Sequence, residues 1–259
     1  MLEKIVKLLK NPLTEYGKII PYITYKLKSV KRNGYELFGN GKFSTDYAGH
    51  NELLKYVGYI RDGFFIECGG NDGWSADPTY YLEKIMSWRG IIIEPLAVYK
   101  KCARRRKKSL IYNYALVADD YSAGCLTLMD CNLMSVVKGV AGYDDWVKNG
   151  EEVQRIKAKE ITVPVITLNK LLDEYYKKYP AQQIDLLVID VEGYELEVLR
   201  GINLSKYQPR YILVEAQTAE RKESVDNYLL PRYEWLAKLG HADYLYKLPN
   251  NLWKMTPSR

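Results

Sequence analysis

The clearest structural signal in this chain lies at residues 184–201, whose sequence is IDLLVIDVEGYELEVLRG. The first six residues are almost all apolar, which is typical of a strand buried on both faces of a parallel sheet. Gly193 permits a tight turn after the strand, the next residues have helical spacing, and Gly201 stops the helix. We interpret the stretch as a strand, a turn and a helix of an α/β protein.

Similar short apolar runs lie on both sides of this stretch and alternate with helical patterns. The runs are at 64–66, 91–93, 110–112, 163–165 and 211–214, and helical patterns are at 80–88 and 96–106. This alternation predicts an open, doubly wound sheet of the α/β class. Residues 119–161 fit it poorly, with a possible strand at 124–129 and a weak helical pattern at 146–159. An insertion of this length can be a substrate loop or a plain excursion, and both interpretations stay open.

Composition limits the class of protein. The chain has 259 residues, 47% of them hydrophobic and 27% charged, which excludes a disordered or collagen-like protein. The net charge of +6 is a mild excess that favours anionic neighbours without requiring them. The four cysteines form no C-x-x-C pair, so we expect free thiols in a reducing, cytoplasmic compartment. We expect neither a signal peptide nor a membrane-spanning helix, because no apolar run exceeds strand length.

Residues 1–50 differ from the rest and predict a basic, helical N-terminal extension to a main domain at 51–259. Apolar residues fall at helical spacing near the start, with lysines between them. Such a stretch can make peripheral contact with an anionic membrane or bind a partner. The interpretation we favour is a helix that covers the side of the main domain with its lysines in water.

The run at 64–66 leads into Glu67 and a glycine-rich turn that contains Gly69, Asn71 and Gly73. Glycine has no Cβ, so a ligand can approach the backbone closely, and ligands of open α/β sheets bind at the carboxyl ends of strands. The dinucleotide fingerprint G-x-G-x-x-G is absent. Glu67 would also face a pyrophosphate with a negative charge, so the pattern favours an uncharged or cationic ligand.

Acidic residues follow two further strands. Glu94 ends the second run and is suited to accept both hydroxyls of a ribose, or to lie at the N-terminus of the helix that follows Pro95. Asp190 and Glu192 are two residues apart at the mouth of the strand in 184–201, where two carboxylates can bind a cation, act as a base or hold a cationic centre. Alternatively, Glu192 caps the following helix.

Four ordered motifs together resemble the FkbM family of S-adenosylmethionine-dependent methyltransferases. They are FIECGGNDG at 65–73, IIEP at 92–95, NYAL at 113–116 and the stretch at 184–201. The resemblance runs from about residue 45 to the C-terminus and includes Glu215 after the signature helix. Gly70 departs from the family, which more often has Ala there, and Val188 stands where Lys is frequent.

The resemblance implies a class I Rossmann-like methyltransferase, with a mostly parallel seven-stranded sheet and helices on both faces. S-adenosylmethionine would be its methyl donor. By the family pattern, the donor-binding residues fall into three groups. These are Glu67, Gly69, Asn71 and Gly73 around the methionine end, Glu94 at the ribose hydroxyls and Ala115 beside the adenine. A sulfonium cation beside Glu67 agrees with the preference of that turn for a cationic ligand.

The resemblance further implies an O-methyltransferase acting on a hydroxyl of a sugar or glycan, such as a polysaccharide or a glycosylated natural product. Asp190 is the first candidate for the base and Glu192 the second, while Glu215 could share Mg²⁺ or Mn²⁺ with Asp190. The alternatives are an RNA or other small-molecule O-methyltransferase, and a non-catalytic binding protein on the same fold. We expect no nucleic-acid partner, and the sequence leaves the oligomeric state open.

Other residues have weaker signals. Tyr80, Tyr81 and Tyr143 lie near enough to the predicted strand mouths to contact an acceptor. The basic cluster at 104–108 ends a predicted helix, where cations interact favourably with the helix dipole in a solvated face. His241, just past a predicted helix at 233–239, and His50 are both interpreted as structural.

Overall fold

The computed structural model describes residues 47–180 and 182–252. The predicted N-terminal extension therefore lies outside the described residues, except for its last turn before α3 (His50–Val57). Within the described ranges, no helix combines the length and the apolar character that a membrane crossing requires. The four cysteines are unpaired, as predicted.

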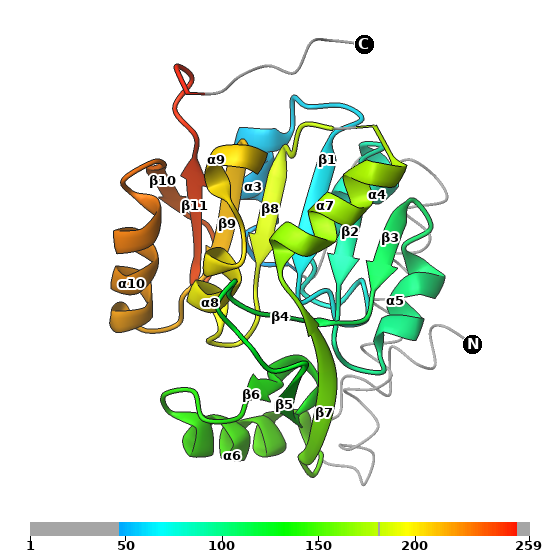
Figure 1. The fold of residues 1–259 in the computed structure, drawn as a ribbon, viewed down its shortest axis with the longest axis vertical. Coiled ribbons are helices and arrows are strands. Elements are labelled where there is room, and N and C mark those ends of the chain that lie inside the picture. Colours follow the sequence, from blue (N-terminus) through cyan, green and yellow to red (C-terminus); the bar gives the residue numbers. More distant parts are fainter. Residues whose placement is uncertain (1–46, 181, 253–259) are drawn as a thin grey trace, which may run out of the picture. The chain divides into compact units, whose positions relative to one another are not determined.

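A seven-stranded sheet forms the centre of the molecule (Figure 1). In spatial order its strands are β10 (Glu234–Lys238), β11 (Asp243–Lys247), β9 (Tyr211–Glu215), β8 (Leu186–Ile189), β1 (Phe64–Cys68), β2 (Arg89–Ile93) and β3 (Ser109–Tyr112). The five strands from β9 to β3 are parallel, and β11 pairs antiparallel with both β9 and β10. This confirms the predicted α/β class and the mostly parallel seven-stranded sheet.

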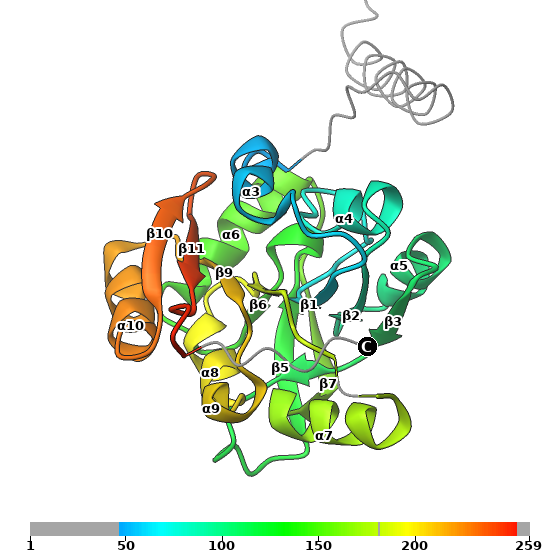
Figure 2. The same ribbon diagram turned by 90° about the horizontal axis from the view of Figure 1, so that it is seen from above.

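Helices cover both faces of the sheet because its central strands are apolar on both sides. Along β1, Phe64, Ile66 and Cys68 pack into one hydrophobic core, and Phe65 packs into the other. Helices α3, α4 (Tyr80–Ile85) and α5 (Tyr99–Arg105) cover the Phe65 side, and α7 (Leu168–Lys178), α8 (Glu195–Arg200), α9 (Leu204–Tyr207) and α10 (Ala219–Leu229) cover the other. Figure 2 shows the two helical layers on opposite sides of the strands.

The insertion that interrupts the alternation forms a second, four-stranded sheet. In spatial order its strands are β4 (Ala115–Leu116), β7 (Lys159–Ile166), β5 (Cys125–Asp130) and β6 (Val136–Val137). Helix α6 (Tyr143–Gln154) connects β6 to β7 in the sequence. Figure 1 shows this small sheet beyond the carboxyl ends of the parallel strands. The run at 163–165 is a strand as predicted, but it belongs to this sheet, where it pairs antiparallel with β5.

The predicted helix at 233–239 is wrong, because these residues form the edge strand β10. The register of β10 against β11 shifts between Trp235 and Ala237, which marks a β-bulge. A bulge breaks the two-residue alternation by which a strand is recognised in a sequence. His241 therefore follows a strand and not a helix.

Candidate active site

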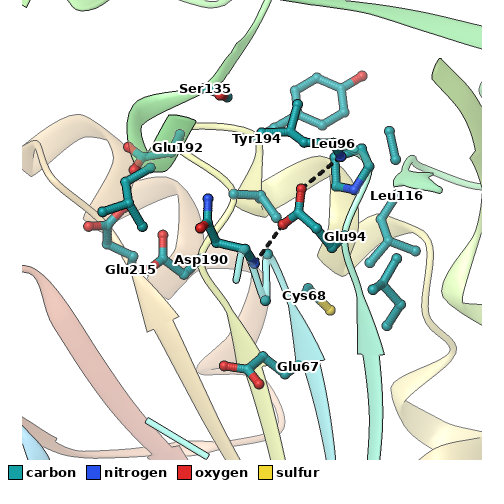
Figure 3. Close-up of a pocket in the computed structure, with 18 of the residues that line it drawn as sticks. Glu67, Cys68, Glu94, Leu96, Leu116, Ser135, Asp190, Glu192, Tyr194 and Glu215 are labelled. Atoms are coloured by element: carbon teal, nitrogen blue, oxygen red, sulfur yellow. Dashed lines mark hydrogen bonds between the residues drawn. The ribbon is translucent and has the colours of Figure 1, made fainter. Parts of the chain in front are cut away.

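A cavity of about 270 Å³ opens at the carboxyl ends of β1, β2, β8 and β9. The small sheet supplies the opposite wall through Leu126, Leu128 and Val137. Figure 3 shows the acidic side chains of Glu94, Asp190, Glu192 and Glu215 around this space. The topology explains their meeting, since the ends of adjacent parallel strands share one edge of the sheet.

The glycine-rich turn follows β1 and requires glycine at its closest approach to β8. Gly69 has φ of +93°, and a Cβ on it would lie 1.8 Å from the carbonyl oxygen of Asp190. Gly70, which departs from the family pattern, is similarly confined, because a Cβ there would lie 2.1 Å from Ile92 Cγ2. Gly69, Gly70 and Asn71 line the cavity, whereas Gly73 packs beside Cys102 and Arg106 of the α5 segment.

Glu94 links the end of β2 to this turn. One carboxylate oxygen accepts the backbone N–H of Asn71 at 2.7 Å, and the other accepts that of Leu96 at 2.8 Å. The side chain is only 3% exposed, and this burial raises its pKa to about 7. The two hydrogen bonds act in the opposite direction, because they stabilise the charged form. Each oxygen keeps a second lone pair, so Glu94 can position the turn and also accept hydroxyl groups.

Asp190, Glu192 and Glu215 form an acidic cluster on the other side of the cavity. One oxygen from each carboxylate lies within 4.8 Å of the others. Burial raises the pKa of all three, to well above the usual range for Asp190, to about 8 for Glu192 and to about 7 for Glu215. Repulsion from neighbouring carboxylates adds to it, from Glu215 for Asp190 and Glu192, and from Glu195 and Asp243 for Glu215.

Gln217 holds two members of the cluster together. Its Nε2 donates hydrogen bonds to Glu192 at 3.0 Å and to Glu215 at 2.9 Å. The sequence analysis missed this residue. Its spacing of two from Glu215, at the end of β9, is the signal that places both side chains on one side of an extended chain.

Glu192 does not cap the helix that follows it. The N-cap of α8 is Tyr194, and the carboxylate that binds the turn is that of Glu195, which accepts the N–H groups of Gly193 at 2.8 Å and Val191 at 3.3 Å. Glu192 itself has φ of +57° and lines the cavity. Its side chain is therefore available to a ligand.

Glu67 lines the floor of the cavity but is bound within a buried network. Its carboxylate accepts a hydrogen bond from Thr79 Oγ1 at 2.7 Å and lies 3.5 Å from Arg106 Nη1. Arg106 also binds Glu83 at 3.0 Å and pairs with Asp77. Burial raises the pKa of Glu67 well above its usual range, with a further contribution from Asp77.

The interpretation of the basic cluster at 104–108 as a solvated helix end is wrong for Arg106, which is 1% exposed. Helix α5 ends at Arg105, and the backbone at Arg106 leaves the helical conformation, with ψ of 76°. That turn directs the side chain inward beneath the glycine-rich turn. A run of five cations gives no sequence signal for which of them is buried.

The aromatic residues at the cavity differ from those predicted. Tyr80, Tyr81 and Tyr143 do not line it, whereas Tyr114 and Tyr194 do. His50 is buried with its ring 4.6 Å from that of Tyr81, and burial lowers its pKa, in keeping with a structural role.

The residues around the cavity fit S-adenosylmethionine. Glu94 has free lone pairs for the two ribose hydroxyls, and Ala115, Leu96 and Leu116 give the cavity an apolar lining that suits an adenine ring. The backbone of Gly69 and Asn71 lies open to the same space. A sulfonium cation nearby would favour the charged forms of Asp190 and Glu192, and so lower the pKa values that burial raises.

The chain was compared with protein-family models, curated proteins and solved structures. The model of the methyltransferase FkbM domain matches residues 67–246. A search of curated proteins gives no match. Among solved structures, the chain is similar to one in a fibrillarin/Nop5p complex, with 12% identity over 76% of this chain and 78% of that one and a TM-score of 0.38. It is also similar to the human methyltransferase 10 domain containing protein, with 12% identity over 78% of this chain and 81% of that one and a TM-score of 0.38. Because the family model spans well over half of its length, this chain belongs to the FkbM family of methyltransferases.

Proposed function

We propose that this methyltransferase transfers the methyl group of S-adenosylmethionine to a hydroxyl of a sugar or glycan, either a polysaccharide or a glycosylated natural product. The observation that carries the proposal is the acidic cluster of Asp190, Glu192 and Glu215, which lines the same cavity as Glu94 and the glycine-rich turn. A hydroxyl acceptor needs a base, and the carboxylates of this cluster are groups that can supply one.

The donor supplies an electrophilic methyl carbon when it is bound. In this proposal Glu94 accepts hydrogen bonds from the ribose hydroxyls, and Ala115 contacts the adenine ring. Gly69 and Asn71 border the methionine end. Glu67 supports that end through Thr79, because its carboxylate is already bound to Thr79 and Arg106. These contacts would fix the donor so that the methyl group points toward Asp190, and alignment of this kind supplies much of the rate.

Asp190 is the proposed base. The acceptor oxygen forms a bond to the methyl carbon while the carbon–sulfur bond breaks, and the hydroxyl proton passes to Asp190. Burial and the neighbouring carboxylates raise the pKa of Asp190, which makes it a stronger base than an exposed aspartate. Glu192 is the second candidate for this role, and Gln217 fixes its orientation.

A divalent cation at the acidic cluster is a proposal that extends this one. Three carboxylates that can converge on one point are ligands of the type that Mg²⁺ and Mn²⁺ prefer. Such an ion would stabilise the charged carboxylates and so lower the pKa values that burial raises in this cluster. Titration calorimetry with MnCl₂ tests it: the expected result is binding to the wild type and at least tenfold weaker binding to Glu215→Gln. Absence of binding to the wild type would remove the metal.

The methylation proposal is tested by incubating the protein with isotopically labelled S-adenosylmethionine and a panel of glycans, with mass spectrometry to locate the label. Methylation of a sugar hydroxyl is the expected result. Label on RNA would favour the alternative acceptor, and donor binding without transfer to any acceptor would favour a non-catalytic binding protein.

An RNA acceptor has less support. Lys101 and Arg105, on the basic helix α5, form ion pairs with Asp72, and Arg106 is buried. These cations are therefore less available to phosphates than the sequence indicates. The absence of a nucleic-acid partner, the cytoplasmic location and a membrane contact through residues 1–50 stay predictions.

A further inference from the structure

A second, larger cavity of about 670 Å³ adjoins the donor cavity. We call it the outer cleft. It lies between residues 138–141, which follow strand β6 of the small sheet, and the helices α8 and α10. Leu126, Val137 and Tyr194 line both spaces, so these three side chains form a shared wall.

The outer cleft has the volume that the donor cavity lacks. Ligand sites are commonly about 300–1,000 Å³, and the donor cavity alone, at about 270 Å³, lies just below that range. A donor bound along Glu94 and the glycine-rich turn would occupy most of it. The main body of an acceptor therefore needs space outside, and the outer cleft is the adjoining space.

The lining of the outer cleft suits a polyhydroxylated ligand. Tyr121 and Tyr194 supply aromatic rings, and Val140 adds an apolar surface. Its polar lining residues are Lys138, Arg221, Ser224, Glu195, Glu197 and Glu220. Two cations and three carboxylates do not give this cleft the positive potential that attracts a polyanion. Hydrogen-bond donors and acceptors beside aromatic rings match the hydroxyl groups and apolar faces of sugars.

Arg221 and Gly193 lie where the outer cleft meets the acidic cluster. The guanidinium is packed against the backbone of Gly193, so that a Cβ on this glycine would lie 2.4 Å from Arg221 Nη2. Arg221 also donates a hydrogen bond of 3.3 Å to the carbonyl oxygen of Ala141, across the cleft. Gly193 follows Glu192 directly, so this part of the cleft borders the turn that carries a candidate base.

One wall of the outer cleft is the segment 140–141, which Gly139 and Gly142 flank with φ values of +89° and +77°. No atom lies within 4 Å of a Cβ built on either glycine, so the backbone at both positions lies in open space, unlike that of Gly69. The segment itself is held by the packing of Val140 against the core of the small sheet and by the hydrogen bond from Arg221 to Ala141. This wall is therefore a formed surface that a ligand can contact.

We propose that the outer cleft binds the body of a carbohydrate acceptor, with Tyr194 contacting a sugar ring while one hydroxyl reaches Asp190. This inference rests on the proposed function and deepens it, because it selects an uncharged, extended carbohydrate over a polyanion. It also assigns Tyr194 and Ser224, neither of which the sequence analysis singled out, to acceptor recognition.

The test fills the outer cleft from α10 and leaves the donor cavity untouched. Ser224→Trp places a bulky ring in the cleft, and Glu223→Trp is the matched control, since Glu223 is the adjacent exposed residue on the same helix and does not line the cleft. Binding of a panel of 4-nitrophenyl glycosides is followed by ligand-observed NMR with S-adenosylhomocysteine present. Calorimetry measures the affinity for S-adenosylhomocysteine separately.

The expected result is a glycoside that binds the wild type and Glu223→Trp equally and binds Ser224→Trp at least tenfold more weakly, with the S-adenosylhomocysteine affinity of all three within twofold. Glycoside binding unchanged in Ser224→Trp overturns the inference. So does a panel in which no glycoside binds, or an RNA oligonucleotide that binds in the cleft instead. Failure of the wild type to bind S-adenosylhomocysteine would instead contradict the proposed function.

Discussion

Glu94 has two roles that compete for one buried carboxylate. As a carboxylate it accepts the N–H groups of Asn71 and Leu96, yet burial raises its pKa to about 7, so much of it is protonated just below neutral pH. Ribose hydroxyls would donate to the charged form and would therefore lower its pKa on binding. Binding at Glu94 is then coupled to release of a proton.

We therefore expect the affinity for S-adenosylhomocysteine to rise between about pH 6 and pH 8 and to level off above. This product lacks the sulfonium charge, so the acidic cluster contributes less to the change. Calorimetry in buffers of different ionisation enthalpy should detect proton release. Glu94→Gln should bind about tenfold more weakly, the loss of about 1.4 kcal/mol from charged hydrogen bonds, with little pH dependence. A pH dependence that survives in Glu94→Gln would contradict this assignment.

Asp190 can be separated from the donor site by its effect on rate. Asp190→Asn keeps the shape of the side chain and removes the base, so turnover should fall by about 10²- to 10⁴-fold. The affinity for S-adenosylhomocysteine should stay within about threefold, because Glu94 and the glycine-rich turn are unchanged. Glu215→Gln serves as the comparison within the same cluster. Turnover of Asp190→Asn equal to that of the wild type would remove Asp190 from the mechanism.

Among the elements, the segment after α5 controls the glycine-rich turn and the start of α4. Arg106 binds Glu67 on β1, Asp77 before α4 and Glu83 on α4. Three segments thus share one guanidinium, and its loss would leave Glu67 and Asp77 buried without the cation that pairs with them, while Glu83 keeps Lys84 Nζ at 3.9 Å. Removing one partner of a buried ion pair costs about 3–5 kcal/mol.

We expect Arg106→Met to lower the free energy of unfolding by about that amount, measured by urea denaturation. Arg104→Met is the control from the same cluster, because Arg104 is exposed, and its effect should be within about 0.5 kcal/mol. Equal effects of the two substitutions would show that the buried network does not stabilise the fold.

The accuracy of the sequence analysis differed between elements for physical reasons. The parallel strands β1, β2, β8 and β9 were predicted because burial on both faces leaves an uninterrupted apolar run. Strand β3 was predicted from its apolar run at 110–112, although its residues are partly buried or exposed. Strand β10 was missed because its bulge breaks the alternation. The pairing of Asp190 with Glu192 was predicted from their spacing, and that of Glu215 with Asp190 from the family resemblance. The burial of Arg106 depends on a backbone turn that no residue type signals.

In the molecule as a whole, the small sheet turns an open sheet edge into an enclosed site. Leu126, Leu128 and Val137 close the donor cavity from the side opposite Glu94, and Tyr194 joins them at the outer cleft. The sequence left this segment as either a substrate loop or an excursion. It forms a sheet through non-local pairing of β5 with β7, and such pairing across a long connection gives only a weak local pattern.

The acidic site also determines how the stability of the whole molecule depends on pH. Glu94 and Glu215 have pKa values raised to about 7, and Glu192 to about 8, chiefly by burial. The folded state therefore binds more protons than the unfolded chain above about pH 5. This contribution to stability is fully present below the unfolded pKa values, near 4.5, and is lost as pH rises through 7 to 8.

We therefore expect the free energy of unfolding to fall between about pH 5.5 and pH 8.5, by about 1.4 kcal/mol per pH unit for each extra proton held by the folded state. Urea denaturation at intervals across this range measures the slope. Glu192→Gln should reduce it, because an amide carries no charge to bury, and should be more stable than the wild type at pH 8.5. Glu152→Gln, an exposed substitution on α6, should leave the slope unchanged. If the free energy of unfolding instead rises with pH, the fold does not raise the pKa values of these acidic residues. Their proposed strength as bases would then have no physical cause.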